Sequence, residues 1–186
     1  LSFLPEKTER APRIVDFFQG SPEGMRISEW MYSGTSGEFI ELTNTSGAAI
    51  DLTGWSLDDD HATAGAFSLS AFGVVQPGES VIVTDADATA FRTAWNLAPT
   101  IKIIGSFGTV GGGNNLGRND QIHLFDATAG LQDRLWFGDQ TYPGSIRTQN
   151  RSGQVGCDAV GLNLLLSWQL SAVGDGFGSV AATTGD

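Results

Sequence analysis

Cysteine and histidine are scarce in this chain, and their scarcity excludes several kinds of site. Cys157 is the only cysteine, so no disulfide forms within the chain and no cysteine cluster holds zinc. We expect this small side chain to be buried or half-buried. The two histidines are His61, in a polar loop, and His123, which we expect to be a half-exposed strand residue. No GxSxG motif occurs, so nucleophilic catalysis has no local signature.

Basic residues are also few. Ten Lys and Arg stand against 21 Asp and Glu, which gives a formal net charge of −11. Such a surface repels a phosphate backbone and an anionic bilayer, so nucleic acid is not an expected partner. This acidity suits an exported, highly soluble protein or one that meets divalent cations, although most acidic surfaces are simply solvated.

Long hydrophobic runs are absent as well. The longest apolar patches, Val81–Val83 and Leu164–Leu166, have the length of strands, so no transmembrane segment is expected. The chain begins at Leu1 and not at Met, which suggests a processed or excised piece. A missing leader peptide therefore says nothing about export.

The residues that are abundant favour a single all-β domain. Five Trp and eleven Phe supply a core, and 25 Gly spread along 186 residues indicate many turns. Short apolar runs alternate with turn signals, and one helix is predicted at Ala86–Asn96, where Asp85 or Asp87 supplies the cap. The pattern predicts a β-sandwich with one short helix insertion.

Residues 25–57 are predicted to form three antiparallel strands joined by tight turns. The runs are Met25–Tyr32, Glu38–Asn44 and Ile50–Leu57. In the first run the alternation slips near Ser28–Glu29, as a β-bulge requires. In the second run Ile40 and Leu42 share one face and Phe39 and Glu41 the other, and either face can be the inner one.

The rest of the chain divides into further strands and two flanking segments. The other predicted strands are Phe67–Ala71, Ser80–Thr84, Ile101–Phe107, Asp120–Asp126, Leu131–Phe137, and closing strands within GSIRTQNR (144–151) and LNLLLSWQLS (162–171). We expect residues 1–24 to be an N-terminal arm or linker, residues 25–170 the β-sandwich domain, and residues 171–186 a C-terminal linker.

Five motifs, in order and at matching spacing, resemble the lamin tail domain family. They are ISEWMY at 27–32, GEFIELTN at 37–44, DLTGWSL at 51–57, VVQPGESVIV at 74–83 and NDQIHLFDATAG at 119–130. The resemblance implies an immunoglobulin-like β-sandwich of the type found in exported bacterial proteins and at the C-terminal end of nuclear lamins. It also implies a non-catalytic module, which we expect to be secreted or in the cell envelope. The edges of a sandwich allow strand addition, so a protein partner or self-association through sheet edges is the expected contact.

The sharpest polar cluster is the loop Asp58, Asp59, Asp60 and His61. Its carboxylates, together with Asp85 and Asp87 of a later loop, are candidate ligands for Ca²⁺, which takes six to eight oxygen ligands. The alternative is an exposed acidic turn, because the spacing matches no EF-hand loop. No other cofactor is expected, and a Ca²⁺-assisted carbohydrate- or surface-binding module is therefore the alternative function.

Glu29 and Glu41 are the remaining candidates for chemistry. On adjacent strands they resemble the paired carboxylates of a glycosidase, which keeps a hydrolase as a third hypothesis. Both residues fall in motifs shared with non-enzymatic relatives, so a structural role is the preferred interpretation. GTVGGGNNLG (108–117) lacks the Lys-Ser/Thr of a phosphate-binding P-loop.

Overall fold

Two central strands, β1 (Met25–Met31) and β2 (Phe39–Asn44), carry the inner face of the larger of two sheets. The computed structural model describes residues 23–108, 115–177, 179, 181 and 182. In β2, Ile40 and Leu42 are fully buried in the main core, whereas Glu41 lies half-buried on the other face. The alternation of β2 therefore places its aliphatic side chains inside the sandwich.

A β-bulge interrupts the pairing of β1 with β2. Ile27 pairs with Leu42 and Glu29 with Glu41, so Ser28 is the extra residue between the two pairs. The bulge predicted near Ser28–Glu29 is confirmed. Beyond the bulge Trp30 pairs with Ile40, and both side chains enter the core.

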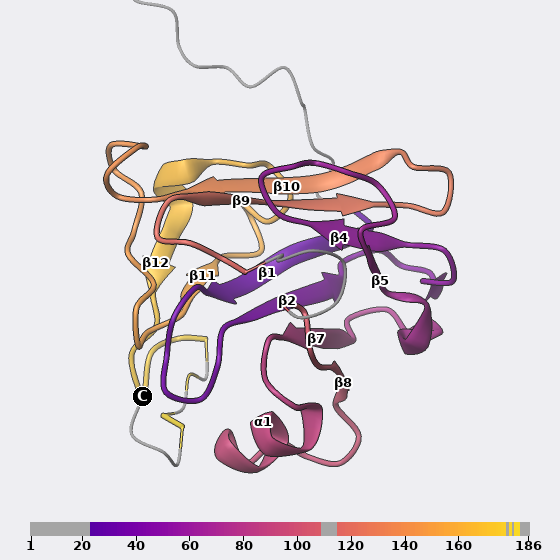
Figure 1. The fold of residues 1–186 in the computed structure, drawn as a ribbon, viewed down its shortest axis with the longest axis horizontal. Coiled ribbons are helices and arrows are strands. Elements are labelled where there is room, and N and C mark those ends of the chain that lie inside the picture. Colours follow the sequence, from indigo (N-terminus) through magenta and orange to yellow (C-terminus); the bar gives the residue numbers. More distant parts are fainter. Residues whose placement is uncertain (1–22, 109–114, 178, 180, 183–186) are drawn as a thin grey trace, which may run out of the picture.

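The larger sheet has six strands. β2 pairs antiparallel with β7, and β7 pairs parallel with β8 at the sheet edge. On the other side of β1 lie β11 and β12, so the order is β12-β11-β1-β2-β7-β8 (Figure 1). The bounds not yet given are β7 (Ser80–Thr84), β8 (Lys102–Ile104), β11 (Gly153–Val155) and β12 (Trp168–Leu170).

The smaller sheet has four strands in the order β10-β9-β4-β5. They are β4 (Ser56–Asp58), β5 (Phe67–Ser68), β9 (Asp120–Phe125) and β10 (Leu131–Phe137). β9 and β10 form the predicted hairpin, with a second bulge between Leu131 and Asp133. A separate two-stranded ladder joins β3 (Ile50–Asp51) to β6 (Val74–Val75).

The predicted third strand of residues 25–57 is wrong as a single element. The run Ile50–Leu57 divides into β3 and β4, and β4 pairs with β5 and β9 in the other sheet. Between them the chain turns, with Trp55 N donating to Leu52 O at 3.0 Å and Gly54 at a φ of 81°. The glycine admits this left-handed conformation, which redirects the chain from one sheet to the other.

The two sheets pack face to face over one hydrophobic core. Trp30 of β1 and Phe137 of β10 stack with ring centroids 3.9 Å apart, and Trp168 of β12 meets Trp30 edge-on at 6.4 Å. Figure 1 shows β9 and β10 lying over β1, with the helix below the other end of the larger sheet. The predicted all-β immunoglobulin-like sandwich is confirmed.

The one α-helix of the described residues, α1 (Ala88–Ala94), lies within the predicted range. It packs on the outer face of the larger sheet and not in the sandwich core. Phe91 of the helix joins Met31, Phe39 and Ile82 of the sheet in a second, smaller apolar cluster.

Several local expectations are corrected by the structure. After β5 the chain forms a 3₁₀ turn, η1 (Ser70–Phe72), instead of continuing a strand to Ala71. A second 3₁₀ turn, η2 (Leu165–Ser167), precedes β12. The segment GSIRTQNR contributes one isolated bridge, Ser33 to Gln149, and the strand β11 follows it.

Two of the predicted side-chain exposures are also wrong. Cys157 is exposed, and His123 is only 4% exposed because the loop after β4 covers it. His123 Nδ1 lies 2.8 Å from the main-chain oxygen of Asp59 in that loop.

The flanking segments are described only in part. Most of the predicted arm, residues 1–22, lies outside the described residues, as does most of the glycine-rich loop at 109–114. After β12 the chain stays against the sheet, where Ser171 N donates to Ser152 O and Ala182 is 5% exposed. The division into an arm, a domain and a linker stays a prediction. No described helix is long and apolar enough to cross a membrane.

Candidate functional site

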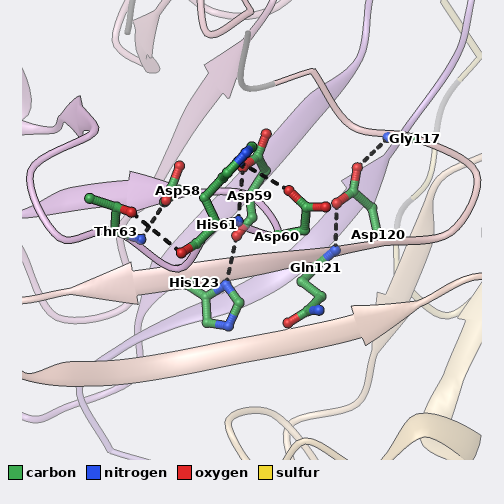
Figure 2. A network of polar contacts seen from close by, with 9 residues as sticks. All are labelled: Asp58, Asp59, Asp60, His61, Thr63, Gly117, Asp120, Gln121 and His123. Atoms are coloured by element: carbon green, nitrogen blue, oxygen red, sulfur yellow. Dashed lines mark hydrogen bonds and ion pairs between the residues drawn. The ribbon is translucent and has the colours of Figure 1, made fainter. Parts of the chain in front are cut away.

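Three aspartates leave β4 and open the loop to β5 (Figure 2). Asp58 and Asp59 are buried, whereas Asp60 and the following His61 are exposed. Asp58 Oδ2 accepts the main-chain N–H of Thr63, which closes the loop on itself. The Asp58 carboxylate therefore holds the loop in shape.

Asp59, Asp60 and His61 form the one group in the described part of the chain that could hold a metal ion. Each offers a ligand atom, and these atoms lie within 4.8 Å of one another. His61 Nδ1 lies 2.9 Å from Asp59 Oδ1 and 3.1 Å from Asp60 Oδ1. The hydrogen bond to Asp59 and the negative charges of Asp59 and Asp60 raise the pKa of His61, which favours the protonated ring beside these carboxylates.

Asp120, at the start of β9, adds a further carboxylate to this group. Figure 2 shows its side chain turned toward Asp60, and its Oδ2 accepts the N–H of Gly117 at 2.6 Å. Burial is the main cause that raises the pKa of Asp120, and the charges of Asp60 and Asp59 add to it. Carboxylates crowded in this way favour either a proton or a cation among them.

Glu38, immediately before β2, completes the acidic cluster on its buried side. It is 7% exposed, and its Oε1 accepts the N–H of Leu116 at 3.0 Å. Burial raises the pKa of Glu38 from 4.5 to about 8, with the charges of Asp85, Asp120 and Asp59 adding to the effect. We call Glu38, Asp59, Asp60, His61 and Asp120 the acidic cluster.

The two later aspartates predicted as ligands have different positions. Asp85 Oδ1 accepts the N–H of Glu38 at 2.9 Å, so Asp85 borders the acidic cluster. Burial raises the pKa of Asp85 too. Asp87 instead caps α1, where its Oδ1 accepts from Thr89 N at 3.0 Å and from Ala90 N at 2.9 Å.

Of the five predicted ligands, the structure thus brings Asp59 and Asp60 together and places Asp85 at the border. It uses Asp58 to close a loop and Asp87 to cap a helix. Sequence reasoning missed Glu38 and Asp120 as members of the cluster. Each lies at a strand start beside a glycine-containing turn, but no local spacing links either one to Asp59.

The second candidate pair, Glu29 and Glu41, lies on the outer face of the larger sheet. The two residues are direct cross-strand partners and both are half-buried. Burial raises the pKa of Glu29, and the charge of Glu41 adds to this effect. They line a hollow of about 250 Å³ beneath α1.

The printed sequence has two histidines, and their hydrogen-bonding contacts in the described residues are to acidic side chains and to the main chain. Within the described ranges the ring contacts of His61 are to Asp59 and Asp60, and the hydrogen bond of His123 is to the main chain of Asp59. A base needs a hydroxyl or thiol nucleophile within hydrogen-bond reach.

Comparison with known proteins agrees with this architecture. No curated protein matches the sequence. The model of the Lamin Tail Domain family matches residues 19–139, about two thirds of the chain, from before β1 to just beyond β10. The matched range contains the whole acidic cluster and both Glu29 and Glu41. Lamin tail domains are non-enzymatic and immunoglobulin-like. The chain belongs to the lamin tail domain family.

Proposed function

We propose that this chain is a non-catalytic binding or structural module of an exported bacterial protein, secreted or in the cell envelope, and that it contacts a protein partner or a second copy of itself. Membership of a non-enzymatic family supports the proposal. The observation that carries it is the length of one sheet edge, formed by β10.

β10 is the outermost strand of the smaller sheet and has seven residues. The other outermost strands of the two sheets, β5, β8 and β12, have only two or three. Very short edge strands are a common protection against unwanted pairing, whereas a long edge is a template for an added strand.

The contact is expected along the C-terminal half of β10. The first half of β10 is interrupted by the bulge. The main-chain oxygen of Gln132 there already accepts a hydrogen bond from Arg26 Nη1 at 2.9 Å, so it is not open to an added strand. Arg134 N donates at 2.8 Å to Asp133 Oδ1, an acceptor on its own strand. Main-chain groups two residues apart point the same way, so the N–H of Trp136 also faces away from β9.

The test is the mass in solution, measured by light scattering over a range of concentrations. If two copies pair through β10, wild type and Trp136→Ala form dimers, and Trp136→Pro is a monomer. Both variants lose the indole, but only proline lacks the N–H, and proline is tolerated in an outermost strand. A wild-type monomer at every concentration removes self-association and leaves a different protein as the partner, to be sought by pull-down from the envelope.

Enzymatic turnover of a substrate would refute the proposal of a non-catalytic module. A preparation that hydrolyses glycans or phosphoesters, and loses this activity on Glu41→Gln, is an enzyme that uses the carboxylate pair. The 250 Å³ hollow next to Glu29 and Glu41 makes this the specific variant to assay.

A Ca²⁺-assisted carbohydrate- or surface-binding module is the second candidate, favoured by the acidic cluster. Burial raises the pKa of Glu38 and of Asp120, with neighbouring carboxylates adding to the effect, and a bound divalent cation would favour the ionised forms. Ca²⁺ at about 100 times its Kd adds roughly 2.7 kcal/mol to the free energy of unfolding.

Melting scans with Ca²⁺ and with chelator test this candidate. The midpoint is expected to rise with Ca²⁺ in wild type and in Asp158→Asn, an exposed aspartate outside the cluster, and to rise less in Asp60→Asn. An unchanged wild-type midpoint at millimolar Ca²⁺ removes the candidate.

A further inference from the structure

A row of side chains crosses the outer face of the larger sheet. Gln154 of β11 pairs with Glu29 of β1, Glu29 pairs with Glu41 of β2, and Glu41 pairs with Ile82 of β7. Residues directly opposite on neighbouring strands have their Cβ atoms about 4.5–5.5 Å apart and point to the same face. Two like charges in such a pair destabilise the sheet unless a proton or a cation compensates them.

Above this row lies the hollow of about 250 Å³, walled by aromatic rings. Phe39 stands on the sheet, and Phe91 and Trp95 come from α1 and its C-terminal end. Their ring centroids are 5.6 Å apart for Phe39 and Phe91, and 5.7 Å apart for Phe39 and Trp95. The volume corresponds to roughly eight water molecules, which suits one long side chain and not a drug-sized ligand.

The charged side chains among the described residues that line the hollow are the two carboxylates of Glu29 and Glu41. No Lys, Arg or His is among the described residues that line it. Gln154 is 7% exposed, and its Nε2 donates to Glu29 Oε1 at 3.1 Å and to Ser179 Oγ at 2.7 Å. Because a carboxylate accepts, the amide nitrogen must face Glu29, and Gln154 Oε1 is then left without a donor in the described part of the chain.

Hydroxyl groups of the sheet compensate this charge only in part. Ser28 Oγ donates to Glu41 Oε1 at 2.7 Å. Arg151 lines an adjoining hollow, but its Nε donates to the main-chain oxygen of Ser171 at 2.8 Å. No cationic side chain of the described residues lines the hollow, which leaves room for a ligand to supply the charge that compensates Glu29 and Glu41.

We propose that this hollow binds a cationic side chain on an aliphatic stem, the arginine or lysine of a basic peptide. The carboxylates of Glu29 and Glu41 pair with the charged head, and the rings of Phe39, Phe91 and Trp95 cover the stem and attract the cation through their faces. The site is separate from the β10 edge, so the inference does not depend on the contact proposed there.

The test compares two probes that differ only in charge, N-acetyl-arginine amide and N-acetyl-citrulline amide. Citrulline has the same length and shape but a neutral urea in place of the guanidinium. Titration calorimetry at low ionic strength is expected to give a Kd on the order of 1 mM for the arginine probe and no measurable binding for citrulline.

Matched variants locate the binding. Glu41→Gln and Glu29→Gln are each expected to weaken arginine binding on the order of tenfold, because each removes one charge-assisted contact and keeps the shape. Asp60→Asn removes the same charge from the acidic cluster and is expected to leave the Kd unchanged. Unfolding curves show whether each variant is folded. If Glu29→Gln does not fold, Glu41→Gln alone tests the proposal.

Three results would overturn the proposal. The first is equal binding of arginine and citrulline probes. The second is a loss of affinity in Asp60→Asn as large as in Glu41→Gln, which would mean that the probe senses only the overall negative charge. The third is binding of methyl glucoside in place of the arginine probe with the same dependence on Glu41, which would assign the hollow to a sugar.

Discussion

Replacing Glu38 by glutamine is expected to change how stability depends on pH. Glu38 is buried at the inner side of the acidic cluster, and its Oε1 accepts the N–H of Leu116. A glutamine amide oxygen can accept the same hydrogen bond without the charge. The substitution therefore isolates the titration of one carboxyl group.

The sign and size of the effect follow from the pKa of Glu38, raised from 4.5 to about 8 mainly by burial. Between these values the native state keeps a proton that the unfolded chain has lost, so the free energy of unfolding falls as pH rises. At about 1.4 kcal/mol per pH unit, the whole interval corresponds to at most about 5 kcal/mol. The contribution of Glu38 to the free energy of unfolding is fully present below pH 4.5. It is lost by pH 8, where the carboxyl group is ionised in the folded protein as well.

Urea unfolding from pH 4 to pH 9 measures this difference. The curve of wild type minus Glu38→Gln is expected to fall between pH 5 and pH 8. Glu79→Gln is the control with the opposite sign, because hydrogen bonds from Gln76 and Lys102 lower the pKa of Glu79. There the stability contributed by the carboxylate is lost only as pH falls below about 4.5, so the Glu79 difference curve is expected to stay flat across pH 5–8. A Glu38 difference curve that stays flat across pH 5–8 would refute the burial argument.

Three further predictions concern stability and are measured by chemical denaturation. Trp30→Ala should cost about 3–5 kcal/mol, since the ring is 1% exposed and packs on Phe137, and a cost near 1 kcal/mol would contradict its role in joining the sheets. Asp133→Ala should cost about 1–3 kcal/mol, because Oδ2 accepts the N–H of Ile27 at 2.8 Å; a neutral result would mean that this N–H finds another acceptor. Asp87→Ala should cost about 1 kcal/mol by uncapping α1, and Asp87→Asn should restore most of it.

Local patterns predicted the fold where neighbouring strands are also neighbours in sequence. The alternation of Asp120–Asp126 and Leu131–Phe137 specified a hairpin, and the slip near Ser28 specified a bulge. The run Ile50–Leu57 misled because alternation shows that a segment is extended but does not choose its partner. Gly54 decides that choice by turning β4 into the other sheet.

The candidate site was predictable to the same extent. Asp59 and Asp60 were found because they are adjacent in sequence, and their approach to His61 is local. Glu38 and Asp120 join them through pairings that span tens of residues, which no spacing motif encodes. Asp87 was predicted both as a cap of the helix and as a ligand, because an aspartate before a helix can serve either role with the same local sequence, and the structure has it as the cap.

The extra residue in β1, Ser28, determines which side chains of β1 enter the core and which face the outer hollow. If β1 and β2 continued regularly from the pair Ile27–Leu42, Ser28 would oppose Glu41 and Glu29 would oppose Ile40, inside the sandwich. A carboxylate there costs several kcal/mol, and Trp30 would point outward, away from Phe137. The bulge at Ser28 instead gives the pairs Glu29–Glu41 and Trp30–Ile40. The same shift that buries the tryptophan therefore creates the acidic pair on the outer face, so the charge of the hollow follows from how the core is packed.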